Sequence, residues 1–162
     1  MSKSKLAEPP HLLGDLKTLG LPGFASNWER LALEAERKRT PHTDYLAELA
    51  HLEVTQRRER RIARLIQDGR FPVLKTLDAF DFATQPSIDR NTVLELARCD
   101  FVANKQNVVL IGGIGTGKTH LAIALGIACA QHERRVRFMT AAEAANELSA
   151  SVDTQKRPVM DT

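Results

Sequence analysis

The sequence has little cysteine and no pattern of a metal site. Among its 162 residues only Cys99 and Cys129 are cysteines, and neither lies in a CxxC motif or a cluster with zinc-ligand spacing. Cys129 and His132 stand three residues apart, but without a second pair of ligands a small buried thiol is the better interpretation. This cysteine content fits a protein of a reducing compartment.

Long apolar runs are also absent. No run approaches the roughly 20 residues of a membrane-spanning helix, and residues 1–10 lack the apolar core of a signal peptide. An apolar content of 43% and a mean hydropathy of -0.28 are typical of a soluble globular protein. We therefore expect a cytoplasmic protein with no membrane partner. The net charge of +3 is too small to decide by itself whether the protein binds nucleic acid.

Residues 108–120, VVLIGGIGTGKTH, have the spacing of a phosphate-binding loop: a glycine, four residues, then Gly-Lys-Thr. Glycines let backbone N–H groups approach the phosphates of a nucleotide, because no Cβ stands in the way. Lys118 can contact the β- and γ-phosphates, and the Thr119 hydroxyl can ligate Mg²⁺. The predicted residues for binding ATP and Mg²⁺ are Gly112, Gly113, Ile114, Gly115, Thr116, Gly117, Lys118, Thr119 and His120, with Thr119 as the metal ligand.

The residues on both sides of this loop support the assignment. Residues 107–111 form a short apolar run that predicts a buried parallel strand, and residues 121–130 predict a helix buried against a sheet. A second strand is predicted at 136–140 and an alanine-rich helix at 141–150. The order of strand, glycine loop and helix favours a nucleotide site over a glycine-rich turn that binds nothing.

Helical patterns dominate the part of the chain before the loop. We predict helices at residues 11–19, 24–39, 45–67 and 88–104. Thr43 or Asp44 is the expected N-cap of the third helix, which should end at Asp68-Gly69.

A run of basic residues interrupts the apolar face of the third predicted helix. Its arginines are Arg57, Arg58, Arg60, Arg61 and Arg64. They can contact DNA phosphates, but no interleaved asparagine, glutamine or aromatic residue is present to contact bases. An equally good interpretation is a solvated helix face with ion pairs to Glu53 and Glu59.

Aromatic residues make up only 5% of the chain, yet Phe71, Phe80 and Phe82 stand together in one short segment. Pro72 keeps this segment from being helical, so we predict an extended linker. Three phenylalanines in such a linker need a surface to pack on, and the neighbouring nucleotide-binding domain is the expected one.

The fold class that follows is α/β, with a helical N-terminal domain followed by the first part of a parallel-sheet P-loop domain. The expected segments are a disordered leader (1–10), a helical domain (11–70), an aromatic linker (71–88), a partial nucleotide-binding domain (89–150) and an unstructured tail (151–162).

Several of these motifs occur together in one known family. They are YLAEL at 45–49, FPVLKTL at 71–77, FDF at 80–82, GTGKTHLAIALG at 115–126 and VRF at 136–138. From about Leu46 to Leu148 the chain resembles the IstB-like transposition helper ATPases, relatives of the helicase loaders within the AAA+ proteins. The resemblance implies an ATP-dependent homo-oligomer that binds DNA and works with a transposase.

The resemblance fails after the loop. Members of the family carry an acidic strand end that holds Mg²⁺ and positions water, and an arginine finger further on. Here the segment 136–140 runs into Thr-Ala-Ala-Glu, and Glu143, Asp153 and Asp161 do not follow an apolar strand. The catalytic residues therefore stay unassigned, ATP turnover at the family's rate is not expected, and a C-terminally truncated copy is the expected explanation.

Two other functions stay open. A helicase-loader-type replication ATPase would use the same nucleotide chemistry with a helicase as its partner. A non-enzymatic helical module would bind DNA or a partner through the basic helix and keep a vestigial nucleotide site.

Overall fold

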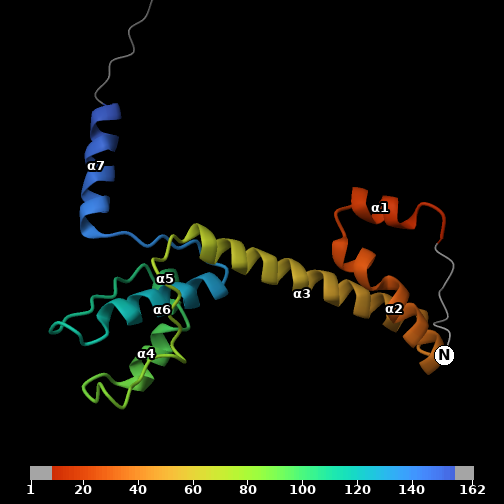
Figure 1. Cartoon of the computed structure of the whole chain (residues 1–162), viewed down its shortest axis with the longest axis horizontal. Coiled ribbons are helices and arrows are strands. Elements are labelled where there is room, and N and C mark those ends of the chain that lie inside the picture. The colour runs from red at the N-terminus through yellow and green to blue at the C-terminus, as the bar shows by residue number, and fades with distance from the viewer. Residues whose placement is uncertain (1–8, 156–162) are drawn as a thin grey trace, which may run out of the picture. The chain divides into compact units, whose positions relative to one another are not determined.

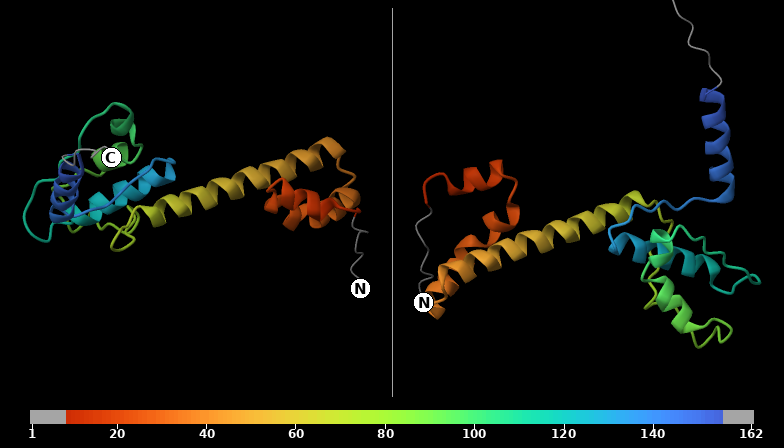
Figure 2. Two further views of the ribbon diagram at one scale, coloured as in Figure 1. Left: turned by 90° about the horizontal axis from the view of Figure 1, so that it is seen from above. Right: turned by 180° about the vertical axis from the view of Figure 1, so that it is seen from behind.

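The computed structural model describes residues 9–155, with side chains described through residue 151. Within this range the chain forms α-helices and no β-strand (Figures 1 and 2). The helices are α1 (Leu12–Thr18), α2 (Pro22–Lys38), α3 (His42–Asp68), α4 (Arg90–Leu96), α5 (Asp100–Ala103), α6 (Lys118–Gln131) and α7 (Ala141–Gln155). The chain divides into two compact units between Arg61 and Ile62, inside α3. None of the described helices is long and apolar enough to cross a membrane.

The first unit contains α1, α2 and most of α3, and its buried apolar residues are Leu16, Leu31 and Leu49. The predicted helices here are confirmed, but the predicted N-cap of α3 at Thr43 or Asp44 is wrong. The backbone N–H groups of Asp44 and Tyr45 already donate to the carbonyl of Pro41, each at 3.1 Å. Proline holds a φ that suits the start of a helix, so α3 begins immediately after it.

A buried carboxylate joins α2 to α3. Glu53 is only 3% exposed, and it accepts hydrogen bonds from Gly23 N at 2.6 Å and from Arg57 Nε at 2.7 Å. Leu21, the N-cap of α2, provides no side-chain cap, so the Glu53 carboxylate caps that helix from α3. Burial raises the pKa of Glu53, but the hydrogen bonds from Arg57 and the α2 backbone outweigh it and leave the pKa below its ordinary value.

Helix α6 is the centre of the second unit. Ile123 and Ala130 are fully buried, and apolar neighbours cover α6 along most of its length, as its sequence predicts. One cluster joins Leu121 to Phe80 and Val93, and another joins Cys129 to Cys99 and Ala128.

The single helix predicted at 88–104 is wrong, because the structure has α4 and α5 in its place. The break lies at Cys99, whose φ of 63° is left-handed. This turn brings the Cys99 thiol to 3.0 Å from that of Cys129, which donates a hydrogen bond to it. Both thiols are free and buried, as predicted for Cys129, and burial followed by the contact with Cys99 raises the pKa of Cys129 to about 12.

The strands predicted at 107–111 and 136–140 are also wrong for the described structure, where neither segment forms a strand. Phe138 N donates to Gly69 O at 2.8 Å, but the described residues form no β-ladder. A groove of about 410 Å³ lies beside them, lined by Val108, Leu110 and Val136 among others. Residues 107–111 still alternate: Val109 is 74% exposed and Ile111 is 91% exposed, while the residues between are half-buried. A strand requires a hydrogen-bonded neighbour, and neither segment provides one for the other.

The alanine-rich helix predicted at 141–150 is present as α7, but it continues to Gln155. The unstructured tail predicted at 151–162 is therefore wrong for residues 151–155, while residues 156–162 lie outside the described part of the chain. Most of the predicted leader, residues 1–8, lies outside it as well.

Candidate phosphate-binding site

The glycine loop leads from the extended segment 107–111 into the first turn of α6. Gly115 and Gly117 have φ values of 78° and 82°, a left-handed conformation that favours glycine. A Cβ built on Gly115 would meet nothing within 4 Å, and one on Gly113 would lie 3.9 Å from Thr116. A Cβ on Gly117 would lie 2.6 Å from the Phe80 ring. The loop therefore has open space at Gly113 and Gly115 and is closed by an aromatic ring at Gly117.

Lys118 lies across this loop. Its Nζ donates to the carbonyl oxygens of Gly112, at 3.0 Å, and Gly113, and it lies 3.4 Å from Thr116 Oγ1. The Thr116 hydroxyl in turn donates to Gly113 O at 3.0 Å. The one cationic side chain of the motif is thus held at the loop itself, where a phosphate oxygen can replace a carbonyl as its partner.

The N-terminus of α6 completes the phosphate site. The N-cap residue Gly117 has no side chain to satisfy the first N–H groups of this 14-residue helix. Those donors and the partial positive charge of the helix end favour an anion at the loop. The residues therefore fit the phosphates of a nucleotide.

A metal ion at this site would need ligands from the nucleotide phosphates as well as from the protein. Thr119 is exposed in the first turn of α6, where its hydroxyl can serve as one ligand. Among the described residues, no group of three or more His, Cys, Asp or Glu side chains could hold a metal. A threonine hydroxyl is a type of ligand that Mg²⁺ can take together with phosphate oxygens and water.

Two predicted site residues point elsewhere. Ile114 stands at the tip of the loop, fully exposed, so only its backbone can contribute. His120 faces the linker: its Nε2 donates to Thr76 O at 2.9 Å, and its ring meets Phe80 edge-on with a centroid distance of 5.1 Å.

The predicted packing of the aromatic linker is confirmed. Phe80, 8% exposed, lies on Gly117, and Phe71 lies on Gly126 in the middle of α6, where a Cβ would come within 2.8 Å of its ring. Reasoning from the motif alone did not include Phe80 or Thr76 in the site. The signal for them was the density of phenylalanine in the linker.

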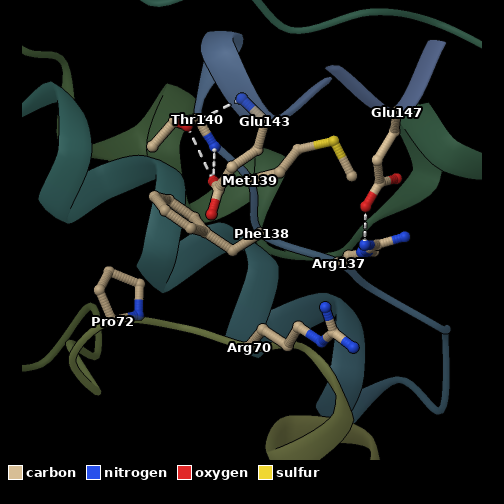
Figure 3. Close-up of a pocket in the computed structure, with 8 residues that line it drawn as sticks. All are labelled: Arg70, Pro72, Arg137, Phe138, Met139, Thr140, Glu143 and Glu147. Carbon is tan, nitrogen blue, oxygen red and sulfur yellow. Dashed lines mark hydrogen bonds and ion pairs between the residues drawn. The ribbon is translucent and has the colours of Figure 1, made fainter. Parts of the chain in front are cut away.

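A second cavity, of about 200 Å³, lies beside the start of α7 (Figure 3). Within it, Thr140 N donates to Glu143 Oε2 at 2.6 Å, and Glu143 N donates to Thr140 Oγ1 at 3.2 Å. These reciprocal bonds form a capping box, and the bonds from Thr140 lower the pKa of Glu143. Arg137 pairs with Glu147 in the same cavity. Glu143 therefore caps α7 in this structure.

Among the predicted DNA-binding arginines, Arg57 and Arg60 have defined hydrogen bonds within the first unit. Arg57 bonds Glu53 and also donates to Gly20 O at 2.6 Å, and Arg60 donates to Gln56 O at 3.1 Å. The ion pair predicted with Glu53 is thus present. Arg58, Arg61 and Arg64 are exposed.

Comparison with known proteins places the chain in an ATP-binding family. The family model described as IstB-like ATP binding protein matches residues 14–158. The chain is 35% identical over 130 residues to the "Insertion sequence IS5376 putative ATP-binding protein" of Geobacillus stearothermophilus, covering 80% of this chain and 52% of that protein. It is 39% identical over 124 residues to the "Insertion sequence IS21 putative ATP-binding protein" of Pseudomonas aeruginosa, covering 76% of this chain and 47% of that protein. The chain thus spans about half the length of these relatives.

Proposed function

This chain belongs to the IstB-like ATP-binding protein family, and from that premise we propose that its glycine loop binds ATP together with Mg²⁺. The observation that carries the proposal is the open loop at Gly113 and Gly115, with Lys118 and the uncapped N-terminus of α6 beside it. The names of the relatives, which describe ATP binding, agree with it.

Each part of the loop has a distinct role in this proposal. Backbone N–H groups of residues 113–117 surround the phosphates, Lys118 exchanges its carbonyl partners for phosphate oxygens, and Thr119 ligates Mg²⁺. The bound metal would neutralise charge on the phosphates. Gly112 and Ile114 contribute backbone only, and His120 holds the helix against the linker.

The α/β AAA+ architecture is part of the same proposal. Segments 107–111 and 136–140 would become parallel strands once neighbouring strands pair with them. The support is the alternating burial of residues 107–111 and the groove that Val108, Leu110 and Val136 line together.

We propose that ATP binding at this site serves DNA transposition. The proposed partners are DNA, a transposase and further copies of the chain. The support is that the named relatives belong to insertion sequences. A helicase-loading role and a non-enzymatic binding module are the alternatives. A transposase gene beside this gene would favour the first role, and a replication gene would favour helicase loading.

Calorimetric titration of the purified chain with Mg·ATP or Mg·ADP tests nucleotide binding. Lys118→Ala removes a charged hydrogen-bond donor worth about 1.5–3 kcal/mol, so affinity should fall roughly 10- to 100-fold. Lys105→Asn is the matched control, because it removes a lysine charge from an exposed left-handed position that asparagine tolerates. Equal affinity of the wild type and Lys118→Ala would contradict the proposal.

DNA binding through the basic helix is tested with a different set of substitutions. Arg57→Ala would also leave the buried Glu53 carboxylate without its Arg57 partner and remove the bond to Gly20 O, so Arg58, Arg61 and Arg64 are the better targets. The full chain with these three changed to glutamine should bind a labelled duplex more weakly and with a smaller salt dependence, by about 0.9 in slope per lost phosphate contact. Fluorescence of Trp28, the single tryptophan, verifies that the first unit is folded. Unchanged affinity and slope would count against these arginines.

A further inference from the structure

We infer that Phe80 is a positioning residue for the phosphate loop, acting from the linker without touching the nucleotide. The inference rests on the proposed nucleotide binding. It concerns a residue outside the glycine motif and outside the set predicted from it.

The first observation is that Phe80 occupies the space of a missing side chain. A Cβ on Gly117 would lie 2.6 Å from Phe80 Cε2 and 3.0 Å from Cζ, while Gly113 and Gly115 have open space. Gly117 is also the N-cap of α6, with a left-handed φ of 82°. The glycines of this loop therefore serve two purposes. Two of them leave room for a ligand, and Gly117 leaves room for the ring that holds the loop.

The second observation is that the same segment holds the first turn of α6 through His120. His120 Nε2 donates to Thr76 O at 2.9 Å, and the His120 ring stands at 88° to that of Phe80. Phe82 supports Phe80 in an edge-to-face contact with a centroid distance of 4.8 Å. Residues 76–82 thus contact α6 at two points of its N-terminus.

The functional consequence follows from the geometry of phosphate binding. Backbone N–H donors bind an anion well only when they all point toward it, so the binding-competent conformation of the loop must be highly populated. If the loop is competent for only a fraction of the time, the apparent dissociation constant rises by the inverse of that fraction. Loss of the Phe80 contact would free Gly117 and the N-terminus of α6, and affinity would fall although no ligand contact is removed.

The chain offers a matched control in Phe71. Phe71 belongs to the same linker and also packs on a glycine of α6, but at Gly126, where a Cβ would lie 2.8 Å from its ring. Phe71→Ala and Phe80→Ala should both lower the melting temperature. Only Phe80→Ala should weaken Mg·ADP binding, by about tenfold if the loop becomes competent one-tenth of the time. Phe80→Leu keeps an apolar side chain and should restore part of the affinity.

Hydrogen exchange without nucleotide provides a readout independent of binding. Amides of residues 112–121 should exchange faster in Phe80→Ala than in the wild type, and at the wild-type rate in Phe71→Ala. Equal loss of affinity in both variants, or unchanged exchange and affinity in a folded Phe80→Ala or Phe80→Leu, would overturn the inference. A wild-type chain that binds no nucleotide would refute the proposed function itself, and the inference with it.

Discussion

The helices of the two units are stabilised by different kinds of interaction. In the first unit, a buried carboxylate on α3 bonds to the N-terminus of α2, and Arg57 supports it. In the second unit, the rings of Phe71 and Phe80 from the linker lie on two glycines, Gly126 within α6 and Gly117 at its N-terminus. One contact depends on charge and the other on shape.

Both contacts use a glycine for the same steric reason. A Cβ on Gly23 would lie 2.6 Å from Glu53 Oε2, just as a Cβ on Gly117 would lie 2.6 Å from the ring of Phe80. The partner determines how the contact responds to conditions. A carboxylate bond weakens when the carboxylate is protonated, whereas ring packing responds to neither pH nor moderate salt.

The largest expected effect is on the aromatic contact. Gly117→Ala forces a side chain into a left-handed position and against the Phe80 ring, which together cost about 3 kcal/mol. Hydrogen exchange of the α6 amides, measured at one pH, should show this loss of protection equally at low and high salt. A loss that varies strongly with salt would contradict the contrast between the units.

A smaller, pH-dependent effect is expected for the carboxylate contact. Glu53→Gln removes the charge from hydrogen bonds to Arg57 and Gly23, at a cost of about 2 kcal/mol at neutral pH. The folded pKa of Glu53 lies below its ordinary 4.5, so the charge stabilises the unit fully above pH 4.5 and progressively less as the pH falls through the folded pKa. The stabilities of the wild type and the variant should therefore converge in acid.

Denaturant unfolding followed by Trp28 fluorescence measures this difference in the first unit. Glu48→Gln is the control, because it removes an exposed carboxylate from the same helix and should leave the unfolding midpoint unchanged at every pH. A Glu53→Gln variant that stays equally destabilised at pH 3 and pH 7 would show that the carboxylate acts through packing alone.

Sequence reasoning succeeded where the signal is repeated along one element. The apolar periodicity of α2 and α3, and the nearly continuous apolar surface of α6, were sufficient to predict these helices. It failed at single residues that redirect the chain, such as the left-handed Cys99 between α4 and α5. It also missed the capping box of Thr140 and Glu143, although Thr-Ala-Ala-Glu is the local pattern for one.

The strands show a different limit. Alternating apolar residues describe which faces of an extended segment are buried, but a strand exists only when another backbone accepts its hydrogen bonds. Residues 107–111 keep the alternation of burial without a hydrogen-bonded partner among the described residues, so this part of the chain shows the pattern but no sheet.

The sequence by itself determined the glycine loop, the lysine and threonine that follow it, and the helix behind them, because these depend on neighbours in the chain. Only the tertiary structure decided that Phe80 closes the loop at Gly117 and that Glu53 caps a helix 30 residues before it. Such contacts depend on which surfaces meet after the chain has folded back on itself. A local sequence pattern indicates that a ring or a carboxylate needs a partner, and the tertiary structure determines which residue that partner is.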